Sequence, residues 1–349
     1  MGKARKLAVI TLEIVLIFVV VFLCVVSSIV VAKKTNQELD NHFFGTRNEE
    51  IIIELWHVET FEGGTASRAK YLEQRAIEFE KQNKGVFILV KSVTKEELKI
   101  AVENDALPDF ISFGYGVQHL IKEKLVPLNL KNAKSLKSTF LASGQNLNSL
   151  LAVPYCYSRY LLFSTPEKME KAGITENTKL SDVLFSAGYS TSTKKKQKNI
   201  YSCVFGGLNN PGIKVISNKQ NAILPESTNL SSFNAYLKFM GGSASILIGN
   251  LRDLARLENK LASGEINKLL CEPYLKQTSL TQNFAVFNNE HASKQTWANE
   301  FIDYCLKPSC QEKLKGIGLL SPCQEIYNQN TLLGTIEAQS KTIEVAKLF

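Results

Sequence analysis

Short apolar runs alternate with amphipathic segments between residues 51 and 113. Three apolar runs, rich in β-branched and aromatic residues, predict buried strands at 51–56, 86–90 and 108–113. Between these runs, apolar residues recur at helical spacing and predict helices over 67–83 and 95–105. Strands that alternate with helices in this order are typical of a parallel sheet covered by helices. The hydrophobic pattern therefore predicts an α/β fold.

The remainder of the chain continues this mixture of elements. The pattern predicts a long extended stretch near 153–163, a strand at 283–287, and helices at 117–124, 167–172, 231–240, 251–262 and 294–306. The polar, lysine-rich stretch at 186–200 is typical of a solvated loop. Because 349 residues exceed the usual size of a single core, we expect two lobes.

The N-terminal segment has a different pattern. Residues 14–32 contain no charged side chain over 19 positions, and as a helix they would span about 28 Å, close to the hydrocarbon thickness of a bilayer. We therefore expect residues 1–34 to form a single-pass membrane anchor, followed by a polar stalk at 35–49. A cleaved signal peptide, ending at Ala32, is the alternative. The basic N-terminal tail predicts a folded domain on the extracytoplasmic side of the cell membrane.

Charge and composition exclude several classes of protein. Hydrophobic residues make up 44% and charged residues 21%, which are values of an ordinary globular protein. Lys+Arg minus Asp+Glu is 41 − 33 = +8, and half of this excess lies in residues 1–34. The rest of the chain therefore lacks the concentrated basic charge of a nucleic-acid-binding domain. Six of the seven cysteines follow residue 34, and their spacing favours buried free thiols over a disulfide framework.

No catalytic motif is visible in the sequence. A nucleophile elbow, a His-Glu-x-x-His pair, a P-loop and a dinucleotide-binding glycine motif are all absent, and the four histidines are scattered. We therefore expect no catalytic residues, no metal and no organic cofactor.

Polar and aromatic residues gather instead where strands end. In an open α/β sheet, ligands bind beyond the carboxyl ends of parallel strands. The first strand is followed by Glu59, Phe61 and Glu62, and the third by Phe113 and Tyr115. The alternation of Tyr155, Tyr157 and Arg159 places them on one face of an extended segment, which is either a half-exposed sheet face or part of a pocket.

Four stretches of the chain carry a resemblance to a known family. They are Ile53–His57 with the following Gly63-Gly64, the Leu107-Pro108-Asp109 strand, the segment 154–165, and the helix and turn at 301–318. In this order and spacing they resemble bacterial extracellular solute-binding proteins, above all the sugar-binding subunits of ABC transporters in the maltose-binding-protein-like family. The resemblance covers residues 50–322.

This resemblance implies a two-lobed periplasmic-binding-protein-like fold with a hinge, an interlobe cleft and crossing strands near residues 155, 285 and 319. We expect residues 50–155 plus 285–318 in the first lobe and 156–284 plus 319–349 in the second. The implied protein is a monomer that binds a small polar solute, by default a sugar or oligosaccharide, and delivers it to an ABC permease.

The resemblance also implies which residues contact the solute. It places Tyr157 at a ligand-contact position, and Asn250 and Arg252 at the matching loop of the second lobe. We expect Glu59, Glu62 and Arg159 to offer charge-assisted hydrogen bonds to the solute. Phe61, Phe113, Tyr115 and Tyr157 are expected to offer stacking surfaces. Gly249-Asn250-Leu251 stands where many relatives have Gly-x-Trp, so the aromatic platform of those relatives is missing.

Three alternatives remain open at this point. The same fold serves a membrane-anchored ligand sensor or a protein that binds other macromolecules rather than a solute. A type II membrane hydrolase of the cell envelope is the alternative from another functional class, against which the missing catalytic motifs count.

Overall fold

The computed structural model describes residues 50–175, 178–182, 203–207, 210, 212–213, 216, 230–289 and 291–349. Ile51–Phe349 form one structural unit, separate from Met1–Glu50. The expected anchor, stalk and lysine-rich loop lie outside the described residues. Within the described part of the chain, no helix is long and apolar enough to span a bilayer.

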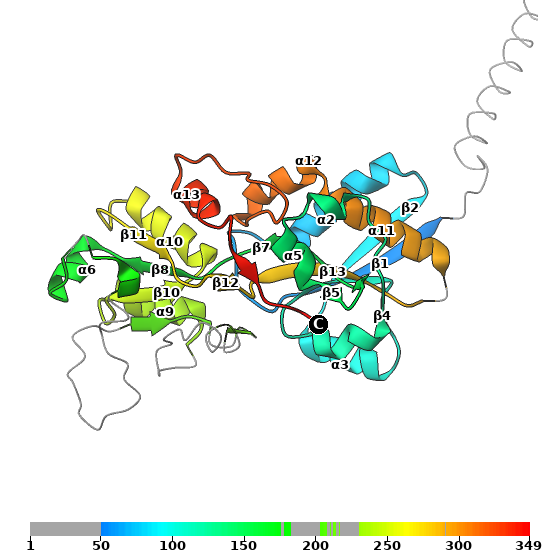
Figure 1. The fold of residues 1–349 in the computed structure, drawn as a ribbon, viewed down its shortest axis with the longest axis horizontal. Coiled ribbons are helices and arrows are strands. Elements are labelled where there is room, and N and C mark those ends of the chain that lie inside the picture. Colours follow the sequence, from blue (N-terminus) through cyan, green and yellow to red (C-terminus); the bar gives the residue numbers. More distant parts are fainter. Residues whose placement is uncertain are drawn as a thin grey trace, which may run out of the picture. The chain divides into compact units, whose positions relative to one another are not determined.

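The first sheet has the strand order β2-β1-β3-β13-β4, and β7 also pairs with β13 (Figure 1). Its strands are β1 (Ile51–Val58), β2 (Val86–Ser92), β3 (Phe110–Gly114), β4 (Leu125–Val126), β7 (Val153–Tyr157) and β13 (Thr281–Phe287). β1 runs parallel to β2 and β3, as the pattern predicts. β13 runs antiparallel to β3, β4 and β7, so the sheet is mixed rather than fully parallel.

Helices cover both faces of this sheet because each has an apolar stripe. On one face, α2 (Arg68–Gln82) and α11 (Ala292–Leu306) pack together, with the ring of Phe79 5.5 Å from that of Phe301. On the other face lie α3 (Lys95–Glu103) and α4 (Gln118–Ile121). The start of α3 is set by a capping box, in which Thr94 and Glu97 bind each other's backbone N–H groups.

The second sheet has the order β11-β8-β10-β9. Its strands are β8 (Leu161–Ser164), β9 (Cys203–Phe205), β10 (Ile246–Gly249) and β11 (Leu270–Pro273), and its helices are α6 (Pro166–Lys171), α9 (Ser232–Met240) and α10 (Leu251–Ala262). We call the first sheet with its helices the first lobe, and the second sheet with its helices the second lobe. The predicted helices at 231–240 and 251–262 agree with α9 and α10 to within one residue.

Shorter elements complete the described structure. They are α5 (Ser138–Ser143), α12 (Pro308–Gln311), α13 (Leu332–Ala338), β5 (Gln145–Asn146), β6 (Ser149–Leu150), β12 (Gln277–Thr278), β14 (Glu344–Val345), and the 3-10 helices η1 (Lys122–Lys124), η2 (Asn132–Ser135) and η3 (Glu312–Ile317).

The limits of the lobes differ from those expected. Residues 281–284, expected in the second lobe, pair with β3 and β7 and belong to the first sheet. At the C-terminus, β14 pairs with β12, Ala346 packs in the apolar cluster of the second lobe, and the Leu348 N–H donates to the Ser143 carbonyl at 2.9 Å. These backbone hydrogen bonds hold the C-terminus against the first lobe and against the segment that connects the two sheets.

Candidate functional site

The carboxyl end of β1 carries two ionisable side chains that contact each other. His57 Nε2 lies 3.5 Å from Glu59 Oε1. Burial lowers the pKa of His57, so its ring is neutral at pH 7. The contact with His57 lowers the pKa of Glu59, and Arg68 at 3.4 Å lowers it further, although partial burial opposes both. Glu59 is therefore an ionised carboxylate, half exposed, at the start of the loop that follows β1.

Arg68 fixes the shape of this loop. Its guanidinium is buried, donates from Nη2 to the Phe61 carbonyl at 2.6 Å, and stacks over the Phe61 ring at 4.3 Å. Because Arg68 is the first residue of α2, the loop is tied to a rigid element. The Phe61 ring, 5% exposed, packs among apolar residues of the second lobe.

The N-terminus of α10 forms the opposite side of the site. Asn250 caps this helix, accepting from the Arg252 N–H at 2.8 Å, while its own backbone N–H donates to Asp253 at 3.1 Å. Asp253 is fully buried and also accepts from Arg256 Nη1 at 2.9 Å. Burial raises the pKa of Asp253, and the hydrogen bonds oppose this shift. These capping hydrogen bonds hold the Asn250 side chain in place. Asn250 Nδ2, in the second lobe, donates to the Glu62 carbonyl of the first lobe at 2.9 Å.

The Glu62 carboxylate makes a second link between the lobes. Its Oε2 lies 3.9 Å from Arg252 Nε and 3.6 Å from Arg256 Nη2. These side chains are partly exposed, so each ion pair contributes little stability by itself. Their position matters more, because they hold the loop after β1 against α10.

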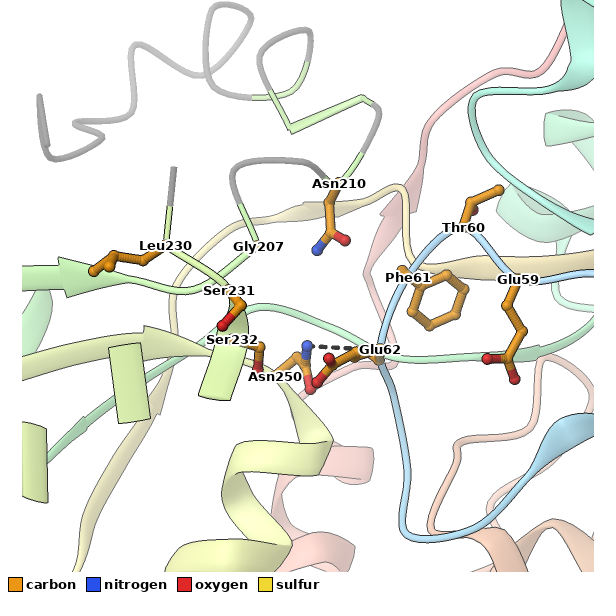
Figure 2. Close-up of a pocket in the computed structure, with 10 residues that line it drawn as sticks. All are labelled: Glu59, Thr60, Phe61, Glu62, Gly207, Asn210, Leu230, Ser231, Ser232 and Asn250. Atoms are coloured by element: carbon orange, nitrogen blue, oxygen red, sulfur yellow. Dashed lines mark hydrogen bonds between the residues drawn. The ribbon is translucent and has the colours of Figure 1, made fainter. Parts of the chain in front are cut away.

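Between these two sides lies a pocket of about 290 Å³ (Figure 2). Its lining comes from both lobes: Glu59, Thr60, Phe61, Glu62, Gly207, Asn210, Leu230, Ser231, Ser232 and Asn250. Figure 2 shows the amide of Asn210 above the pocket, with Ser231 and Asn250 on the second-lobe side and the Phe61 ring on the first-lobe side.

The chemistry of the lining suits a hydroxyl-rich ligand. Glu59 and Glu62 offer carboxylate acceptors, Asn210 offers an amide, and Ser231 offers a hydroxyl. Charge-assisted hydrogen bonds to carboxylates are roughly twice as strong as neutral ones. In the described part of the chain, no three His, Cys, Asp or Glu side chains are grouped so as to hold a metal, and the six cysteines there are free thiols.

Four of the nine residues predicted to contact a ligand line this pocket: Glu59, Phe61, Glu62 and Asn250. Arg252 lies beside it through its ion pair with Glu62. Tyr115 is half-buried and lies against Gly212, near the pocket but outside its lining.

Phe113 and Tyr157 lie in the core instead. Phe113 is 0% exposed and belongs to the apolar cluster between β3 and helices α3 and α4. Tyr157 is also 0% exposed, with its ring 4.6 Å from that of Phe140 in α5. The pairing of β7 with β13 shifts register opposite Tyr155, and the face that we expected to be open at Tyr157 is covered by α5. The expectation that these two rings contact a solute is corrected accordingly.

Arg159 points to another part of the molecule. Its guanidinium donates to the Leu275, Gln339 and Ser340 oxygens beside the C-terminal segment. It therefore lines a different cavity, and the expectation that it contacts a ligand together with Glu59 is corrected.

Six further residues line the pocket without having been predicted from the sequence, and all but the first belong to the second lobe: Thr60, Gly207, Asn210, Leu230, Ser231 and Ser232. A signal for Ser231 was present, because it is the first residue of the helix predicted at 231–240 and serines favour the N-cap position. Asn210 has no such signal, because its approach to the pocket depends on how the second lobe meets the first.

The comparisons with known proteins find similarity in structure but none in sequence. No family model and no curated protein sequence matches the chain. Among solved structures, the maltose-bound MalE3 of T. maritima has a TM-score of 0.60 at 12% identity, over 86% of this chain and 90% of that one. The sugar-binding protein MalE of Xanthomonas citri has a TM-score of 0.58 at 13% identity, over 85% and 86% of the two chains.

A third similar structure is the cyclic α-maltosyl-1,6-maltose binding protein of Arthrobacter globiformis. Its TM-score is 0.57 at 12% identity, over 85% of this chain and 88% of that one. At these identities the similarity concerns the fold, and it spans nearly the whole of the compared proteins. The chain therefore has the two-lobed α/β fold of the maltose-binding-protein-like sugar-binding proteins, as the resemblance in its sequence predicts.

Proposed function

We propose that this protein binds a small carbohydrate in the pocket between the loop after β1 and the N-termini of α9 and α10. The observation that carries the proposal is the convergence of two carboxylates, an amide and a hydroxyl from two lobes on one pocket. A sugar presents hydroxyl groups in several directions, so partners on both sides of a pocket hold it better than partners on one side. The similar structures of T. maritima and Arthrobacter globiformis, described as binding maltose and a cyclic maltosyl sugar, support the same ligand class.

The size and lining of the pocket favour a small sugar. A volume of about 290 Å³ is at the lower end of the range for small-molecule sites. The Phe61 ring in the lining is almost fully buried, and Asn250 occupies the second-lobe loop where a tryptophan platform is missing. We infer a mono- or disaccharide rather than a long oligosaccharide.

We further propose that the lobes close on the sugar by a hinge motion and that a monomer delivers it to an ABC permease. The two segments that connect the sheets, residues 158–160 and 274–280, support a hinge because they are short and join two separately packed sheets. The links from Glu62 to Asn250, Arg252 and Arg256 are contacts that a closed state uses and an open state breaks.

Glu59→Gln tests the binding site. It removes the negative charge while keeping the shape of the side chain. Because a hydrogen bond to a charged group contributes about 1.5–3 kcal/mol, we expect affinity for the bound sugar to fall about tenfold to a hundredfold. Calorimetric titration with glucose, maltose and mannobiose measures this for the parent and the variant, and small-angle scattering of the same samples detects closure.

Glu96→Gln is the matched control, because Glu96 is an exposed acid in the first turn of α3, outside the pocket lining. Its affinity should equal that of the parent. If the parent binds none of these sugars, the proposed ligand class is wrong; if Glu59→Gln binds as tightly as the parent, the proposed site is wrong.

We also propose that residues 1–34 remain attached as a membrane anchor, which would keep the binding domain at the extracytoplasmic surface. The support is the uncharged run at 14–32. Protein extracted from bacterial membranes should require detergent and should have the intact mass of a chain that retains this segment. A mature chain that begins at Lys33, or one with lipid on Cys24, would contradict the proposal.

A further inference from the structure

A second cavity, of about 900 Å³, lies beside the C-terminal segment. One side of the cavity is formed by residues 273–276, which run from the end of β11 toward β12. The other is residues 339–344, between the end of α13 and β14. Arg159 lines it too, and the cavity shares no lining residue with the sugar pocket.

Arg159 is a buried cation with neutral partners. Its side chain is 4% exposed, and Nη1 donates to the Gln339 carbonyl at 3.2 Å and to Ser340 Oγ at 2.7 Å. Nη2 donates to the Leu275 carbonyl at 3.2 Å, while Nε has no partner. Among the described residues, no carboxylate forms an ion pair with this guanidinium. Burial lowers the pKa of Arg159 to about 10, so it stays protonated at neutral pH.

The end of α13 compensates only part of this charge. Gln339 is the C-cap of α13, and the exposed carbonyls at a helix C-terminus carry roughly half a negative charge. A buried cation that no anion neutralises is unfavourable, so a positive potential remains in the cavity. Glu344, an exposed residue at the start of β14, is the single acid among the described lining residues, and it forms no ion pair with Arg159.

We propose that this cavity binds a small solute through an oxyanion group, a carboxylate or a phosphate, held against Arg159. The guanidinium is already held in place by its three hydrogen bonds, which limits the entropy lost on binding. The hydroxyl of Thr342 lies in the same lining and offers a further donor.

Thermal unfolding and calorimetry of the full-length chain in detergent test this proposal. The probes are sodium phosphate and sodium citrate at millimolar concentration, compared with sodium chloride at the same ionic strength. One of the two should raise the unfolding temperature in a saturable way, and which one does so distinguishes the phosphate from the carboxylate. Saturation separates site binding from the general stabilisation by kosmotropic anions, which grows steadily with concentration.

Arg159→Gln is the obvious variant, but it also removes bonds that hold the C-terminal segment. The decisive variant is therefore Thr342→Glu, which adds a carboxylate to the lining at an exposed position and leaves the Arg159 hydrogen bonds intact. We expect it to weaken anion binding at least about tenfold by like-charge repulsion. Thr296→Glu, on the exposed surface of α11, is the matched control and should bind as the parent does.

Two results would overturn the proposal. One is that neither phosphate nor citrate acts differently from chloride on the parent protein. The other is an equal response of the parent and Thr342→Glu. Neither of these anion measurements depends on sugar binding at the other pocket. A negative result would therefore contradict the anion site and leave the proposed sugar-binding function unchanged.

Discussion

Gly64→Ala is expected to lower the free energy of unfolding by about 3 kcal/mol and to abolish sugar binding. Gly64 has φ = +70°, where an alanine is strained by about 1–2 kcal/mol. In addition, a Cβ there would lie 2.1 Å from the Ile317 carbonyl oxygen, which accepts the Thr65 N–H at 2.7 Å. Because this neighbour is backbone, the loop itself has to move, and the loop carries Glu59 and Glu62 to the pocket.

Urea unfolding and calorimetric titration measure the two effects. Gly264→Ala is the matched control, because Gly264 has φ = +75° and nothing within 4 Å of the added Cβ. It should show the conformational strain alone and leave binding unchanged. If Gly64→Ala is no more destabilised than Gly264→Ala, the close approach of Gly64 to Ile317 is absent in solution.

Asp253→Ala is expected to destabilise the second lobe by about 3 kcal/mol, the usual scale when one partner of a buried polar network is removed. The carboxylate accepts from the Asn250 N–H, from Arg256 and from Ser232 Oγ at 3.2 Å. Without it, Arg256 and the start of α10 lose their buried acceptor. Asn250 is then no longer held in the position from which it contacts Glu62, so sugar affinity should fall as well.

Chemical unfolding measures this loss, with Glu103→Ala as the control. Glu103 pairs with Lys99 on the exposed side of α3, and both side chains are more than half exposed. Exposed pairs contribute little, so this variant should unfold like the parent. Equal stability of Asp253→Ala and Glu103→Ala would contradict the network described for Asp253.

The helices of the second lobe were predictable because their signals are local. Residues 251–262 place apolar side chains at helical spacing, and Asn250 precedes them with Asp253 three positions later, as in a capping box. All these interactions join residues within four positions of one another. For the same reason, the predicted α2 and α3 agree with the structure to within two residues.

Strand pairing was less predictable because it joins distant residues. The sequence predicts a strand at 283–287, but not that Ala285 pairs antiparallel with Ile111 in the first sheet. Nothing in the local pattern of either strand specifies its partner. The course of the C-terminal segment, which pairs with β12 and then reaches α5, depends on such distant pairing as well.

The residues of the candidate site show the same difference between local and distant interactions. The sequence by itself determined that Glu59, Phe61 and Glu62 lie at the carboxyl end of a strand, because the strand ends where its apolar run ends. Only the tertiary structure decided that Tyr157 is covered, since its burial depends on α5, a separate element that packs over that face. It also decided that Arg159 lines a second cavity, because its partners at 275 and 339–340 lie more than 100 residues away along the chain.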